Sequence, residues 1–195
     1  MKNALDGRDF ITIGIFNAIG IVVYMAMAFA LTTTVVGGFV SSGISLGIAA
    51  PVYLLMGMKI RKRGVFILSG ILLGLFALAG GHIWHMICAV LGGLICDFVI
   101  GNYGSRTKII FGYGLFALLD YFGTVMPVIL FGTKTFIDNA TNKWKLSTEQ
   151  IEKTMPYFTI RWILFFGVIT CVAACSGAVV AMQILKKHFK KAGVI

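Results

Sequence analysis

Apolar residues fill six long segments of this chain, and each segment ends at a short polar or glycine-rich stretch. A membrane-spanning helix needs about 20 mainly apolar residues, and the six segments approach or exceed that length. They predict an all-α integral membrane protein with six transmembrane helices, in a single domain that covers residues 1–195. The predicted spans are residues 10–31, 38–58, 65–80, 84–100, 109–131 and 159–185.

The composition favours lipid as the solvent of these segments. Hydrophobic residues make up 58% of the chain and charged residues only 12%. A soluble domain of 195 residues cannot bury that much apolar surface. The net charge of +10 lies in short clusters between the apolar segments, and not along one face, so nucleic acid is not an expected partner.

The basic clusters predict the orientation in the bilayer. Of the 17 basic residues, 12 fall on one side of the predicted spans. Cytoplasmic loops carry the excess of Lys and Arg, so both termini are expected in the cytoplasm. The turn near residue 82 and the loop at about 132–158 are then outside. The 12 residues are Lys2, Arg8, Lys59, Arg61, Lys62, Arg63, Arg106, Lys108, Lys186, Lys187, Lys190 and Lys191.

The outer loop at about 132–158 is expected to contain a short helix. Ser147 is a suitable N-cap, and Gln150 follows it three residues later, which is the spacing of a capping box. Trp144, Tyr157 and Phe158 favour a lid docked on the outer end of the helices. A solvated linker is the alternative.

Two of the three histidines, His82 and His85, lie where Gly80-Gly81 interrupts an apolar run. If the backbone there is helical, the two imidazoles share a face. In one interpretation they bond loop carbonyls and Trp84 anchors the interface. In the other, at least one histidine ligates the iron of a haem. Histidines on one helix face cannot flank a macrocycle, so at most one is axial, and a second ligand would come from span one, where Tyr24, Met25 and Met27 are the candidates.

Asp120 lies in the middle of a predicted span, where an acid is costly and normally faces a cavity or a partner. It could bond a substrate, pair with Arg161 or form hydrogen bonds within the bundle. At the outer side, Arg161 and the other cations of the outer loop could bind the carboxylates of a flat anionic ligand, and Trp144 and Trp162 could pack on its faces. A solvated, weakly basic loop is the alternative. Tyr24, His82, Trp84, His85, Asp120, Trp144, Arg161 and Trp162 are thus the candidate substrate-binding residues.

Small residues at helical spacing predict close helix contacts. Gly14 and Ala18 in span one could pack internally or dock another membrane protein. No catalytic motif or phosphate-binding loop is evident, so neither an enzyme nor an intrinsic cofactor is expected. The thin alternative is a small intramembrane hydrolase built on Asp120 with His82 or His85. The four cysteines are expected to be packing residues.

Four stretches carry a resemblance to a known family. They are residues 8–19 (RDFITIGIFNAI), 70–74 (GILLG), 92–97 (GGLICD) and 187–194 (KHFKKAGV). Together they resemble the Trep_Strep group of bacterial integral membrane proteins, which is placed among the S components of energy-coupling factor (ECF) transporters. The tail is the most specific of the four.

The resemblance implies a six-helix substrate-binding subunit of a bacterial ABC importer in the cell membrane. Such a subunit binds a small molecule near the outer surface and docks on a membrane T component that carries paired ATPase subunits. A small-residue face on the first helix, here Gly14 and Ala18, would form the docking surface. Some relatives are associated with haem uptake, so haem is the first expected ligand and a water-soluble vitamin or other nutrient the second.

Overall fold

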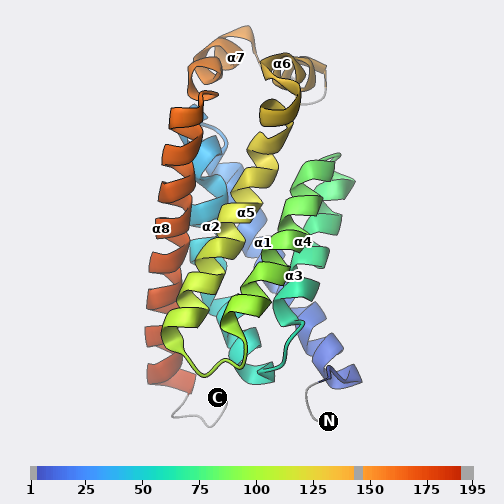
Figure 1. Ribbon diagram of the computed structural model, residues 1–195, viewed down its shortest axis with the longest axis vertical. Coiled ribbons are helices and arrows are strands. Elements are labelled where there is room, and N and C mark those ends of the chain that lie inside the picture. The colour runs from blue at the N-terminus through green and yellow to red at the C-terminus, as the bar shows by residue number, and fades with distance from the viewer. Residues whose placement is uncertain (1–3, 143–146, 190–195) are drawn as a thin grey trace.

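The computed structural model describes residues 4–142 and 147–189, and within these ranges every regular element is a helix. Six apolar helices run roughly along the long axis of the molecule, and two short helices cross one end (Figure 1). The six are α1 (Gly7–Leu31), α2 (Val35–Ile60), α3 (Val65–Ala79), α4 (Ile83–Ile100), α5 (Arg106–Phe131) and α8 (Ile160–Ile184). The short helices are α6 (Thr133–Asn142) and α7 (Thr148–Thr154); the turns η1 (Met155–Tyr157) and η2 (Leu185–Phe189) flank α8.

Five of the described helices are long and apolar enough to cross a membrane: α1, α2, α4, α5 and α8. The prediction of six spans is confirmed for these five. The sixth apolar segment, α3, has 15 residues, which gives a length of about 22 Å against a hydrocarbon core of about 30 Å. It ends early because Gly80 and Gly81 stop the helix, and Gly81 adopts a left-handed conformation with φ of 82°.

The two ends of the bundle differ in charge. We call the end that carries α6 and α7 the outer end, after the orientation predicted from charge, and the opposite end the inner end (Figure 1). The inner end holds the start of α1, the end of α8, the basic connection at 61–64, and the connection at 101–105, which Arg106 and Lys108 follow in α5. This arrangement is the one that the positive-inside rule requires. The cytoplasmic location of the inner end stays a prediction.

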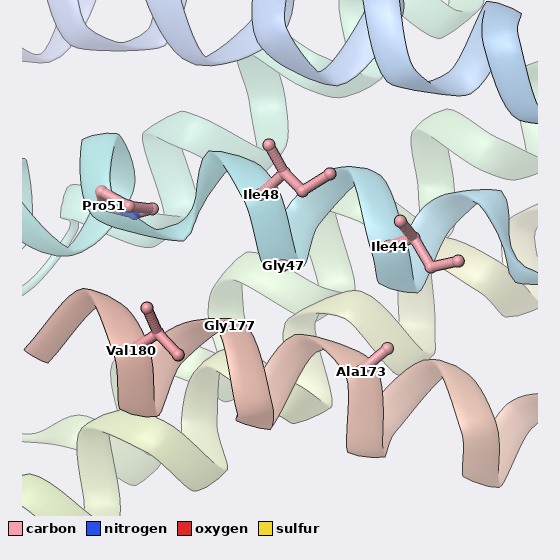
Figure 2. A pocket seen from close by; sticks show the side chains of 7 residues that line it. All are labelled: Ile44, Gly47, Ile48, Pro51, Ala173, Gly177 and Val180. Carbon is pink, nitrogen blue, oxygen red and sulfur yellow. The ribbon is translucent and has the colours of Figure 1, made fainter.

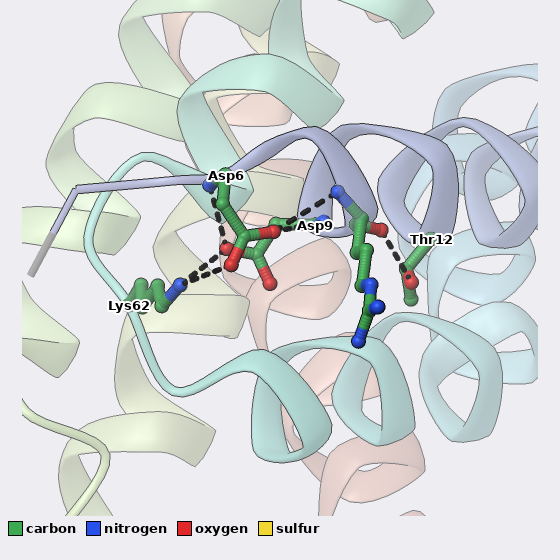
Figure 3. Close-up of polar contacts among 5 residues, drawn as sticks. Asp6, Asp9, Thr12 and Lys62 are labelled. Atoms are coloured by element: carbon green, nitrogen blue, oxygen red, sulfur yellow. Dashed lines mark hydrogen bonds and ion pairs between the residues drawn. The ribbon is translucent and has the colours of Figure 1, made fainter.

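An acidic clamp fixes the start of α1. Asp6 caps the helix, and Lys62 from the α2–α3 connection lies 3.4 Å from Asp6 and 2.5 Å from Asp9 (Figure 3). The backbone N–H of Asp9, together with Lys62, holds the pKa of Asp6 below its ordinary value. The hydrogen bond to Asp9 raises the pKa of Lys62. Both groups therefore stay charged around neutral pH, and the clamp persists.

Helices α2 and α8 approach each other through glycines (Figure 2). Pro51 has no N–H, so the carbonyl of Gly47 lacks its helical partner. Gly177 packs against that carbonyl so closely that a side-chain methyl would clash with it. Gly177, in the predicted span at 159–185, is thus used for packing inside the bundle. An open apolar groove beside the contact is lined by Ile44, Gly47, Ile48, Pro51, Ala173, Gly177 and Val180.

Asp97, near the inner end of α4, caps the neighbouring helix α3. Its Oδ2 accepts hydrogen bonds from the backbone N–H groups of Gly64 (3.1 Å) and Ile67 (2.8 Å). The residue is 4% exposed. An acid near the basic end of a span suggests a salt bridge to the basic loops, but among the described residues no ion pair joins Asp97 to a cation. Four N–H groups at a helix start lack helical partners, and a buried carboxylate satisfies two of them here.

The outer loop is docked, as its aromatic residues predicted. Ser147 and Gln150 form the expected capping box at the start of α7. Phe158 meets the ring of Phe39 on α2 edge-on at 5.3 Å, and Tyr157 meets Trp162 on α8 at 5.3 Å. These rings hold the segment that carries α7 and η1 against the outer ends of α2 and α8. We call Phe39, Tyr157, Phe158, Trp162 and Phe166 the outer aromatic cluster.

The cysteines pack as expected. Cys88, Cys96, Cys171 and Cys175 are all free thiols. Cys171 and Cys175 lie against Gly114 of α5, where an added methyl group would come within 3.2 Å of the Cys171 sulfur and nearer still to that of Cys175. The sulfurs therefore occupy the space that the glycine leaves between α5 and α8.

Candidate functional site

Four helices bring polar side chains to one point inside the bundle. Asp120 on α5 is fully buried, with an exposed fraction of 0%. Its Oδ1 lies 2.6 Å from Nε2 of His85 on α4. Its Oδ2 accepts a hydrogen bond from the hydroxyl of Tyr24 on α1 at 2.9 Å. The hydroxyl of Ser42 on α2 also interacts with the carboxylate. We call these four residues the interior site.

The interior site resolves the alternatives for Asp120. A buried carboxylate is costly unless it is paired and hydrogen-bonded, and here both oxygens have donors. Of the three roles considered for Asp120, hydrogen bonding within the bundle is confirmed. Arg161, the alternative partner, is an exposed residue in the first turn of α8, and in the described part of the chain no ion pair joins it to Asp120.

Gly123 makes the geometry of the interior site possible. It lies three residues after Asp120, where α5 packs on the start of α4. A methyl group on Gly123 would lie 2.6 Å from Cα of His85, closer than such contacts occur. The glycine therefore lets the His85 backbone approach α5 until its ring reaches the carboxylate. Pro127 adds to the irregularity, since it cannot donate to the Gly123 carbonyl.

Asp120 controls the orientation of the His85 ring. A carboxylate only accepts hydrogen bonds, so Nε2 is held as the protonated nitrogen. This leaves Nδ1 as the ring nitrogen for a ligand. A carboxylate behind an imidazole is the arrangement that orients histidine ligands in metal sites. The His85 side chain is 15% exposed, whereas Asp120 is not exposed at all, so the imidazole is the member of the pair within reach of a ligand.

The backbone at His82 is not helical, so the condition under which His82 and His85 would share a helix face is not met. His82 is the N-cap of α4, with φ of −99° and ψ of 71°, and therefore lies outside the helix. Its residue is exposed, whereas His85 lies within the first turn and is turned into the bundle. The non-helical backbone that follows Gly81 separates the two imidazoles.

The remaining predicted residues do not join the interior site. Trp84 packs on Phe131 at the outer end of α5, with ring centroids 5.8 Å apart. Trp162 belongs to the outer aromatic cluster and is 39% exposed. Trp144 falls at 143–146, outside the described residues. The structure therefore divides the predicted set into an interior group, Tyr24, His85 and Asp120, and separate residues nearer the outer end.

Asn17 and Ser42 were missed by the sequence reasoning. Asn17 is 1% exposed, and its amide donates to Ser69 of α3 at 3.1 Å and to the Ile13 carbonyl at 2.9 Å. A usable signal existed for Asn17, because it lies two helical turns before Tyr24 and hence on the same face. The sequence contains no comparable signal for Ser42, because a serine in a small-residue segment is equally compatible with simple helix packing.

The family comparison agrees with this all-helical architecture. A model described as a hypothetical bacterial integral membrane protein (Trep_Strep) matches residues 7–191. The chain belongs to the Trep_Strep family. No curated protein and no solved structure matches it. The family assignment covers all of the membrane-spanning helices, including each residue of the interior site.

Proposed function

We propose that this Trep_Strep protein is the substrate-binding S component of an ECF-type importer. It would capture a small molecule from the outer side of the bacterial cell membrane and deliver it through a membrane T component with paired ATPase subunits. The interior site carries the proposal. An ionisable group buried inside a membrane bundle marks a ligand or ion site by default, and Asp120 here orients a partly exposed imidazole.

Haem or a related tetrapyrrole is the first proposed ligand. The support is chemical: a carboxylate-held imidazole is a suitable iron ligand, and Asp120 holds the imidazole of His85 in this way. The separation of His82 from His85 limits axial ligation from this region to one histidine. Exposed Arg161 and the aromatic rings at the outer end would suit the carboxylates and faces of such a molecule.

A small polar nutrient, such as a water-soluble vitamin, is the second candidate. The observation in its favour is the number of hydrogen-bonding groups around one carboxylate: the Tyr24 hydroxyl, the Ser42 hydroxyl and the His85 ring. Polar groups of a small ligand could replace any of these donors. We propose binding, and not catalysis, for this set of groups.

The outward face of α1 supports the docking part of the proposal. Gly14 and Ala18 are both exposed, and a methyl group on Gly14 would have no atom within 4 Å. The opposite face carries the buried residues Ile13, Asn17, Gly20 and Tyr24. Small residues on an unpartnered membrane face allow another helix to approach closely. We propose that the T component packs on Gly14 and Ala18.

The direct test is titration of the purified chain with haemin in detergent. The proposal expects a shift of the Soret band that disappears in His85→Ala and persists in His82→Ala. A spectrum unchanged by the wild-type chain would reject haem, and calorimetry with water-soluble vitamins would then test the second candidate.

Co-expression with the T component and ATPases tests the transport role. Ala18→Trp should block assembly, whereas Val172→Trp, on the exposed face of α8, should not.

A further inference from the structure

The inner end carries a surface of unpaired positive charge. Eight exposed cations come from four separate places: the start of α1, the α2–α3 connection, the start of α5 and the end of α8. We call them the inner basic surface. They are Arg8, Lys59, Arg61, Arg63, Arg106, Lys108, Lys186 and Lys187.

The acids of the inner end do not neutralise this surface. Asp6 and Asp9 are both bound to Lys62 (Figure 3), and Asp97 is buried as the cap of α3. Within residues 4–142 and 147–189, no ion pair joins any of the eight cations to an acid. Lys62 is the one cation of these connections that the protein itself neutralises.

The outer end shows the contrast. Its described charged residues are three cations, Lys134, Lys153 and Arg161, and three acids, Asp138, Glu149 and Glu152. Lys153 is paired with Glu149 one helical turn away. Over the full sequence the outer end also holds Lys143 and Lys145, so five cations and three acids give it a net charge of +2. The inner end has twelve cations and three acids, a net charge of +9. The positive-inside rule requires only an excess of cations on the cytoplasmic side. It does not require that every nearby acid bind elsewhere and leave these cations without an ion pair.

The connections that present these cations are fixed in shape. Tyr103 of the α4–α5 connection lies where a methyl group on Gly57 of α2 would be 2.9 Å from its ring, so this connection packs on the end of α2. Arg61 has a left-handed backbone with φ of 54°, and its Nε donates to the Met58 carbonyl at 2.9 Å. One edge of its guanidinium is thus held, and the terminal amino groups remain for an anion. A guanidinium fork suits a phosphate oxygen pair.

We propose that the inner basic surface binds the headgroups of anionic phospholipids. Clusters of four to eight Lys and Arg next to membrane helices attract acidic lipids, and the ends of membrane-spanning helices place this surface at headgroup depth. Arg61 and Arg63 form its most constrained part. This inference does not depend on the identity of the transported ligand.

The test uses the full chain in detergent micelles, with phosphatidylglycerol and phosphatidylcholine of identical acyl chains as probes. Native mass spectrometry should show phosphatidylglycerol binding about tenfold more tightly, and thermal unfolding should rise with that lipid alone. Raising the salt concentration should shrink the preference, since exposed charges are screened. Equal affinity for the two lipids would overturn the proposal and assign the surface to an acidic protein partner.

Variants locate the effect. Arg61→Gln with Arg63→Gln should lower phosphatidylglycerol affinity by about tenfold or more, since each cation near an anionic surface is worth about fivefold. The matched control is Lys134→Gln with Lys153→Gln at the outer end, which removes the same charge and should leave the phosphatidylglycerol affinity unchanged. Arg61→Lys with Arg63→Lys preserves the topology signal and should retain most of the preference. An equal loss in the outer pair would contradict the assignment.

Discussion

The two buried aspartates of this bundle, Asp97 and Asp120, have different kinds of partner. Asp97 accepts from backbone N–H groups at the start of α3. Asp120 interacts with side chains on three other helices: Tyr24 on α1, Ser42 on α2 and His85 on α4. A backbone donor is part of the fold and cannot leave without unwinding a helix. A side-chain donor can rotate away and be replaced by a group of a ligand.

The difference in partners indicates which of the two buried acids is associated with function. Both residues are nearly or fully inaccessible, at 4% and 0% exposed, so burial does not separate them. The partner of Asp120 does, because the His85 side chain is partly exposed. Asp97 has a structural role and Asp120 is proposed to support a ligand site. Substitutions at and around the two aspartates test whether their roles differ in this way.

The largest effect is expected for Asp97→Ala. It leaves two N–H groups of α3 without their acceptor, and hydrogen bonds to a charged group contribute about 1.5–3 kcal/mol each. We expect a loss of about 3 kcal/mol in the free energy of unfolding, measured by chemical denaturation in detergent, or a failure to accumulate. Asp97→Asn keeps an acceptor oxygen and should recover most of the stability. A stable, ligand-impaired Asp97→Ala protein would reverse the proposed roles.

His85→Ala should act on ligand binding more than on stability. Loss of a ligating histidine or its supporting group typically lowers affinity by about 10–100-fold. Haemin affinity from absorbance titration is the measurement, and His82→Ala is the matched control, with an expected change of less than about twofold. A larger loss in His82→Ala would place the ligand at the turn and not in the interior.

Gly123→Ala should damage the same site without altering a polar group. The added methyl would lie 2.6 Å from Cα of His85, and such overpacking costs about 1–2 kcal/mol. We expect lower thermal stability and weaker haemin binding together. Gly14→Ala is the control, since its methyl would meet no atom within 4 Å, and its stability should be unchanged. Normal binding by Gly123→Ala would mean that the close approach of α4 is not required.

Tyr24→Phe is expected to have the smallest effect. It removes one hydrogen bond between α1 and Asp120, and such bonds between membrane helices are worth about 0.6 kcal/mol. Hydrogen exchange should increase in the outer half of α1, while the inner half stays protected by the bond between Asn17 and Ser69. Uniform exchange along α1 would show that Tyr24 does not hold the helix.

Much of the architecture could be predicted from the sequence because lipid imposes long apolar segments. The break at Gly80-Gly81 and the capping box at Ser147 were recognisable from local residues alone. The predicted span at 65–80 also matches α3 (Val65–Ala79), but its apolar pattern did not show that this helix is too short to count among the five candidate spans. Asp120 could be selected as an inward-facing acid from its depth in the segment.

The contacts between Asp120 and its partners could not be predicted from the sequence. Tyr24 lies 96 positions away and His85 lies 35 positions away, and their contact depends on how α1, α4 and α5 are rotated. That rotation is set by glycines such as Gly123, whose role appears only when the neighbouring helix is placed. The split between His82 and His85 likewise depends on one non-helical residue, which a spacing rule does not detect.

One measurement tests the central claim most directly: haemin titration of Asp120→Asn beside Asp97→Asn, two isosteric changes at the two buried acids. The account predicts that Asp120→Asn lowers haemin affinity by about tenfold or more, while Asp97→Asn binds as the wild type does. Equal affinities for both variants and the wild type would contradict the assignment of the ligand site to Asp120 and His85.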